Sequence, residues 1–166
     1  ELLAFCQGRT LAGLIELAET TRDHQGPVEE RLLQLITGHV VLLNEEIPGS
    51  LAHLEIEALE SPWKEQILEQ RDRYEAILTE LLDEGIRSGV VRATETGIAV
   101  RAILGAVNWT VKWFQPRGPR TSREIGTEIA TLLVRGLLAP GREMQTPIPR
   151  LRADARRSVA KGGNDA

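Results

Sequence analysis

Apolar side chains recur at helical spacing in several segments of this chain, and prolines and glycines separate those segments. The breaks lie at Gly26-Pro27, Pro48-Gly49, Pro62, residues 116–119 and Pro140-Gly141. No segment shows sustained alternation of apolar and polar residues, so the pattern predicts no strands. The sequence therefore predicts an all-α fold, a bundle of about six helices.

The expected helices cover residues 1–20, 27–46, 50–59, 62–88, 94–114 and 121–138. Several of their ends carry capping signals. Gly26 and Pro27 fit the N-cap and first helical position, Thr94 fits an N-cap, and Gly89 fits a left-handed C-cap. Thr121 and Glu124 have the spacing of a capping box.

The expected domain covers residues 1–139, and residues 140–166 are expected to form a flexible basic tail. The tail holds several prolines and glycines and almost no apolar periodicity, so it cannot bury enough surface to offset its ordering entropy. Residues 152–160 could form a helix on a partner. The formal charge divides accordingly, because residues 1–140 carry −7 and residues 141–166 carry +3.

The segment 95–114 is apolar around nearly its whole circumference, unlike the other helices. Such a helix must be covered on two sides, and in a short chain one cover can be a second copy. The last helix has a similar stripe with small neighbours, so these two helices from each of two protomers predict a four-helix interface. Its expected residues are Ile103, Val107, Ile125, Ile129, Leu132, Leu133 and Leu137. Burial of both helices inside a monomer is the alternative.

Composition narrows the class of protein further. The net charge of −4 gives no reason to expect direct nucleic-acid or membrane binding. Cys6 is the single cysteine, which rules out an intrachain disulfide and fits a cytoplasmic location. The most apolar stretch, residues 102–111, is about half of the ~20 residues that a membrane span needs. No signal-peptide pattern opens the chain.

Known catalytic and metal-binding motifs do not occur in the sequence. There is no Walker loop, no dinucleotide fingerprint, no nucleophile elbow and no paired-histidine zinc motif. The Glu-x-x-His signature of di-iron bundles fails at all three histidines. The sequence therefore predicts neither an enzyme nor a cofactor or metal site.

Polar and aromatic groups interrupt the apolar faces of three helices. Asn108, Trp109 and Trp113 lie in the most apolar helix, His39 lies between Ile36 and Val40, and Tyr74 lies in the stripe of 62–88. Each could be a satisfied core residue. Together they would give an apolar cavity the convergent polar groups of a small-molecule site.

One stretch resembles a known family. Residues 108–119, Asn-Trp-Thr-Val-Lys-Trp-Phe-Gln-Pro-Arg-Gly-Pro, precede a helix that opens Thr121-Ser122-Arg123-Glu124-Ile125. This resembles the end of TetR-family transcriptional regulators, especially the branch that senses acyl-CoA or lipid-derived ligands. Residues 83–92 look like that family's link into its first dimerisation helix, and Glu1–Cys6 looks like the start of the helix after the DNA-binding unit.

The resemblance, over residues 1–139, implies a homodimeric ligand-binding domain without an enzymatic activity. It implies that DNA is bound only through an N-terminal helix-turn-helix domain that this sequence does not include. An apolar or acyl-type ligand between segments 27–46, 63–88 and 95–114 would release DNA by changing the spacing of the two DNA-binding heads, ~34 Å for successive major grooves. The expected ligand-binding residues are Trp109, Asn108, Trp113, Tyr74, His39 and Arg71. Arg73 and Arg101 are further candidates for an anionic head group.

Two other functions stay open at this stage. An unrelated helical interaction module would bind a different protein through the same apolar surface. A small helical enzyme acting on a lipid or acyl thioester would instead line a catalytic pocket with His39, Asn108 and Trp109.

Overall fold

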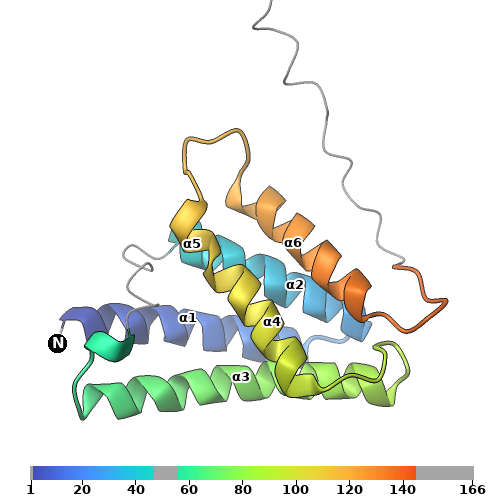
Figure 1. Cartoon of the computed structure of the whole chain (residues 1–166), viewed down its shortest axis with the longest axis horizontal. Coiled ribbons are helices and arrows are strands. Elements are labelled where there is room, and N and C mark those ends of the chain that lie inside the picture. Colours follow the sequence, from blue (N-terminus) through green and yellow to red (C-terminus); the bar gives the residue numbers. More distant parts are fainter. Residues whose placement is uncertain (1, 47–55, 145–166) are drawn as a thin grey trace, which may run out of the picture.

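The computed structural model describes residues 2–46 and 56–144 of the chain (Figure 1). In these ranges the secondary structure is helical, apart from loops and one antiparallel β-bridge between Val91 and Leu138. The helices are α1 (Leu2–Asp23), α2 (Val28–Val41), α3 (Trp63–Arg87), α4 (Thr96–Asn108), α5 (Thr110–Trp113) and α6 (Ser122–Leu137). A π-helical turn, η1 (Leu42–Glu46), continues α2, and a 3-10 turn, η3 (Ile56–Ala58), precedes α3.

The predicted all-α fold is confirmed, with two differences in detail. The expected helix 94–114 is two helices, because α4 ends at Asn108 and the four-residue α5 begins at Thr110. The expected element 50–59 is described only from Ile56, where it is a 3-10 turn. The tail predicted over residues 140–166, including the conditional helix 152–160, lies almost wholly outside the described residues.

The helices form two neighbouring pairs with a fifth helix laid across them (Figure 1). The helix α1 lies along α3, and α6 lies along α2. The helix α4 runs obliquely and contacts α2, α3 and α6. This arrangement places α4 between the protein interior and one outer face of the bundle.

Capping interactions fix the ends of these helices. The Thr121 hydroxyl accepts from the Glu124 amide, and the Glu124 carboxylate accepts from the Thr121 amide, so the predicted capping box is confirmed. The left-handed cap at Gly89 is also confirmed, with φ of +69°. Gly89 N–H donates to Ile86 O and Val90 N–H to Gly85 O, the two bonds of a Schellman motif.

Two expected caps are wrong by one residue. The N-cap of α4 is Glu95 and not Thr94, because the Glu95 carboxylate accepts from the amides of Gly97 and Ile98. Pro27 is the N-cap of α2 rather than its first residue, because its ψ of 140° is not helical. Differences of one residue at a helix end are common, and the sequence pattern does not resolve them.

The main hydrophobic core brings together residues of α1, α2, α3, α4 and α6. A smaller cluster joins the start of α1 to η3 and α3. Close packing of α6 on α2 depends on Gly126, because a Cβ there would lie 3.0 Å from the Thr37 carbonyl oxygen. None of the described helices is long and apolar enough to span a bilayer.

Candidate functional site

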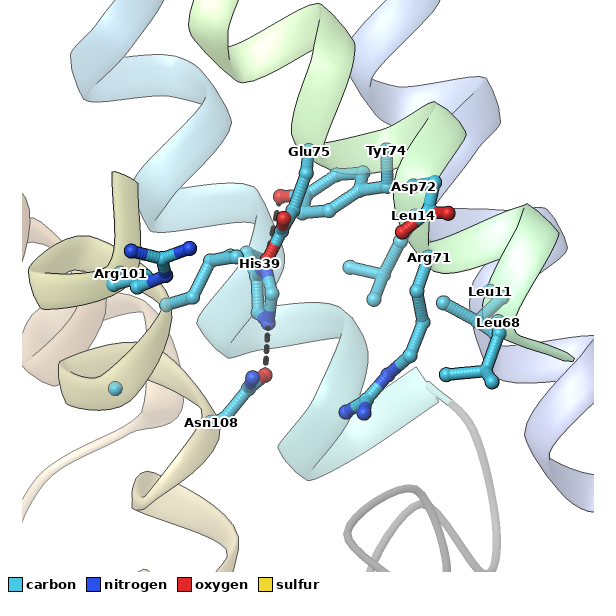
Figure 2. A pocket seen from close by; sticks show the side chains of 12 residues that line it. Leu11, Leu14, His39, Leu68, Arg71, Asp72, Tyr74, Glu75, Arg101 and Asn108 are labelled. Atoms are coloured by element: carbon cyan, nitrogen blue, oxygen red, sulfur yellow. Dashed lines mark hydrogen bonds between the residues drawn. The ribbon is translucent and has the colours of Figure 1, made fainter. Parts of the chain in front are cut away.

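A cavity of about 270 Å³ lies between α1, α2, α3 and α4 (Figure 2). One part of its wall is aliphatic and comes from α1, α3 and α4. The remainder is polar or charged. The lining residues are Leu11, Leu14, His39, Leu68, Arg71, Asp72, Tyr74, Glu75, Arg101, Leu104, Gly105 and Asn108.

Three of the lining residues form a hydrogen-bonded chain across the interior (Figure 2). The Tyr74 hydroxyl lies 2.8 Å from His39 Nδ1, and His39 Nε2 lies 2.9 Å from Asn108 Oδ1. The chain joins α3, α2 and α4, and the His39 and Tyr74 rings meet at a tilt of 60°. It therefore holds the three helices that form most of the cavity wall in one arrangement.

Burial determines the protonation state of this network. His39 is 1% exposed, and desolvation lowers the pKa of its imidazole to about 4, against a smaller opposing effect of the Asn108 hydrogen bond. Desolvation also raises the pKa of the Tyr74 hydroxyl. Both groups are therefore neutral near pH 7, and the site offers fixed hydrogen-bonding groups rather than a base or a nucleophile.

Four of the six predicted ligand-binding residues line this single cavity. They come from three helices that are far apart in the sequence: His39, Arg71, Tyr74 and Asn108. A role in ligand binding is a prediction for each of them. Arg101 also lines the cavity, whereas Arg73 is ion-paired with Glu19 on the exposed side of α3.

The structure does not place Trp109 or Trp113 at the cavity. Their exposed fractions are 60% and 48%, and neither is among the lining residues. The reason is helical geometry, because Trp109 follows Asn108 directly and so points about 100° away from it around the axis.

The end of α4 is fixed by polar contacts beside the cavity. The buried Thr110 hydroxyl donates to Val107 O and accepts from the Asn44 side chain. Asn44 in turn donates to Val40 O, which connects the end of α2 to the α4–α5 junction. These contacts set the position from which Asn108 reaches His39.

Seven lining residues were not predicted from the sequence. The aliphatic ones have helical spacing, which is equally typical of core residues, and the two carboxylates look like ordinary surface positions. They are Leu11, Leu14, Leu68, Asp72, Glu75, Leu104 and Gly105. They are identified as lining residues only because the structure places them around the same cavity as the predicted polar residues.

The outer face of α4 and α6 carries an apolar stripe that the described residues cover only in part. Its members follow helical spacing, i, i+4, i+7 and i+11, on both helices. They are Ile98, Ala102 and Gly105 on α4, Trp109 directly after it, and Ile125, Ile129, Leu132 and Gly136 on α6. Leu132 is 73% exposed, although a leucine side chain gains free energy on burial.

Four of the seven expected interface residues lie outside this stripe, two of them in the main core and two, Leu133 and Leu137, beside the stripe on α6. Ile103 is 2% exposed and Val107 is 0% exposed, because both point into the main core against α2 and α3. The apolar residues of α4 surround the helix, so the sequence did not reveal which of its sides faces inward. Ile125, Ile129, Leu133 and Leu137 are half-buried.

A second cavity of about 270 Å³ lies between the start of α1 and the start of α3. Its walls include Phe5, Trp63 and Ile67, and its polar lining is limited to Gln66 and Gln70. It lacks a hydrogen-bonded chain between helices. Within residues 2–46 and 56–144, no group of three or more metal-ligating side chains comes together.

Comparison with known proteins relates the whole arrangement to one family. Residues 25–137 match the family described as tetracyclin repressor-like, C-terminal domain. That range includes all of α2, α3, α4 and α6. No curated protein matches the chain.

Several solved structures share the fold. The TetR family transcriptional regulator PfmR from Thermus thermophilus is 27% identical with a TM-score of 0.75, over 84% of this chain and 75% of that one. A TetR/AcrR family regulator from Thermobifida fusca is 22% identical with a TM-score of 0.70, over 81% and 72%. AibR, solved in complex with isovaleryl coenzyme A and operator DNA, is 21% identical with a TM-score of 0.68, over 84% and 74%.

Proposed function

Because this chain belongs to the family of tetracyclin repressor-like C-terminal domains, we propose that it is the effector-binding and dimerisation domain of a transcriptional repressor. The observation that carries the proposal is the position of α4. One side of α4 lines the cavity, and the adjacent side forms the exposed apolar stripe. Family membership also makes the chain part of a regulator and not an enzyme.

The side of α4 that lines the cavity and the side that forms the stripe consist of residues that are adjacent in the sequence. The cavity residues Arg101, Leu104 and Asn108 are each followed by a stripe residue, at positions 102, 105 and 109. Gly105 belongs to both sets. A ligand that shifts or rotates α4 would therefore alter the outer face directly, because a helix moves as a rigid element.

The stripe on α4 and α6 fits a second copy of this chain. An exposed face with Ile98, Trp109 and Leu132 favours a partner that buries it, and two such helix pairs make a four-helix contact about a twofold axis. The homodimer is thus the state in which we expect the domain to act.

An acyl-type ligand suits the cavity. Its aliphatic wall, with Leu11, Leu14, Leu68 and Leu104, can hold a short hydrocarbon chain, while Asn108 can bind a polar group. The complex of AibR with isovaleryl coenzyme A supports a ligand of this class. DNA would be bound by a part of the regulator outside this domain, and the ligand would act by favouring one spacing of the two DNA-binding heads.

Sedimentation of the chain tests the dimer, with Leu132→Arg as the disrupting variant. We expect the wild-type chain to sediment as a dimer at micromolar concentration. Leu132→Arg should sediment as a monomer with unchanged helical content, because an arginine at the centre of the interface would be buried without a partner.

Leu2→Arg is the matched control, because Leu2 is 78% exposed but lies on α1. It should remain dimeric. A monomeric wild-type chain, or a dimer that tolerates arginine at position 132, would overturn the proposed interface.

A further inference from the structure

Arg71 stands out among the charged residues that line the cavity because its side chain is half-buried, whereas Asp72, Glu75 and Arg101 are exposed. Within the described ranges it forms no ion pair and no hydrogen bond, whereas Arg73 on the same helix pairs with Glu19 and Lys64 pairs with Glu57. Arg71 is half-buried, and burial lowers the pKa of its guanidinium, with the charge of Glu75 opposing the shift. A guanidinium remains charged at any physiological pH, so it bears a desolvation cost that Glu75 offsets only in part.

The position of Arg71 directs this charge into the cavity. Figure 2 shows its side chain extended from α3 to the level of the Asn108 side chain, across the opening from α4. The other charged lining groups are Asp72, Glu75 and Arg101, all on exposed residues. Among the ion pairs of the described residues, neither carboxylate pairs with Arg71 or Arg101.

The direction of the hydrogen bonds from Tyr74 through His39 to Asn108 leaves a second hydrogen-bond donor, besides Arg71, beside the cavity. The buried Tyr74 hydroxyl has His39 Nδ1 as its acceptor, so it donates there. His39 Nε2–H then donates to Asn108 Oδ1. The opposite order would leave the Tyr74 proton buried without an acceptor. Asn108 therefore keeps its amide N–H groups for the cavity, and those groups can only donate.

We propose that the effector carries an anionic group that pairs with Arg71, while its hydrocarbon part lies against the leucines of α1, α3 and α4. This inference rests on the proposed function, and it specifies the chemical class of the effector that the same cavity would bind. Arg101 on α4 adds a second positive charge at the rim, and the Asn108 amide donates one further hydrogen bond. An anion held between Arg71 on α3 and groups on α4 would add a contact between these two helices that is present only in the liganded state.

The volume of the cavity limits the size of the enclosed part. A volume of about 270 Å³ is many times the space that one water molecule needs, so the cavity can take the hydrocarbon part of a medium-chain carboxylate. An acyl thioester of coenzyme A presents the same anionic chemistry through its phosphates, but these would lie outside the enclosed space.

Calorimetric titration of the full chain with octanoate and 1-octanol tests the inference. The two probes have the same hydrocarbon length and differ in charge. We expect octanoate to bind at least about tenfold more tightly than 1-octanol, which is the effect of one charge-assisted contact in a partly buried site. Arg71→Met should remove this preference and leave the binding of 1-octanol unchanged, which also shows that the cavity is intact.

Two further variants test whether the preference depends on position 71 and on its positive charge. Arg73→Met is the matched control and should retain the preference, because Arg73 points away from the cavity. Arg71→Lys keeps the positive charge and should retain part of it. If both probes bind and their affinities are equal, or if the preference survives in Arg71→Met, the anionic assignment is wrong although the apolar cavity binds hydrocarbon chains.

Octanoyl coenzyme A identifies the source of the anion. If octanoyl coenzyme A binds and octanoate does not, the phosphates supply the negative charge. The inference then holds if Arg71→Met weakens the binding of octanoyl coenzyme A by at least about tenfold. Absence of binding by all three probes would overturn the inference together with the proposed effector function.

Discussion

His39 links the chemistry of the cavity to the stability of the fold. It is a buried, neutral imidazole held between a phenol and an amide, and burial lowers its pKa to about 4. In the unfolded chain the same group titrates near 6.5. Between these values the unfolded state binds more protons than the folded state, so the stability falls as the pH falls.

We expect the free energy of unfolding to drop by about 2 kcal/mol between pH 7 and pH 5 because of this histidine. Above pH 7 the contribution of His39 should be constant. Urea unfolding at fixed protein concentration measures the effect. His39→Gln should show a flatter dependence over the same range, since glutamine does not titrate.

His24 supplies the control, because it is exposed and His24→Gln should leave the wild-type dependence unchanged. Equal slopes for wild type and His39→Gln would contradict the buried neutral state.

At the residue scale, the sequence identified the polar groups of the site better than the aromatic ones. His39 and Tyr74 were recognisable because each interrupts an apolar stripe. Trp109 and Trp113 also interrupt an apolar helix, but the direction of their side chains depends on the rotation of that helix about its axis, which residue type does not encode. Arg71 was identified only by its position.

At the scale of elements, the packing of α6 on α2 depends on a residue without a side chain. A Cβ at Gly126 would lie 3.0 Å from Thr37 O and 3.1 Å from Val40 Cβ. Gly126→Ala should therefore destabilise the domain by about 1–3 kcal/mol, because backbone atoms on α2 must move. Chemical denaturation at fixed protein concentration measures this cost.

Gly8→Ala is the comparison, since the nearest atom to a Cβ there is Ile67 Cδ1 at 3.9 Å. It should be neutral or stabilising by up to about 1 kcal/mol, as alanine favours the helix. If Gly126→Ala proved as stable as Gly8→Ala, the close approach of α2 and α6 would be wrong.

Element boundaries were predictable where a cap has one suitable residue. Gly89 alone could supply the positive φ after α3, and Thr121 with Glu124 gave an unambiguous box. The start of α4 offered both Thr94 and Glu95, and the structure uses the second. The break between α4 and α5 had no sequence signal, and the contact that Thr110 makes there with Asn44 on another element could not be read from the sequence either.

At the scale of the whole molecule, α4 joins two surfaces that regulation would need to couple. Its inner side was the harder one to predict, because apolar residues surround the helix and only packing against α2 and α3 shows that Ile103 and Val107 face inward. The exposed stripe, with Leu132 at its centre on α6, then follows by exclusion. A ligand that contacts α1, α3 and α4 together can favour one arrangement of the bundle by its differential affinity alone.

Native mass spectrometry of the purified chain, with and without added octanoate, tests the central claim most directly, because it reports the oligomeric state and the bound ligand in one spectrum. We expect the main species at twice the mass of the chain, with up to one octanoate or co-purified acyl ligand for each protomer. A monomer that retains no ligand at any octanoate concentration would contradict an effector-binding, dimerising domain.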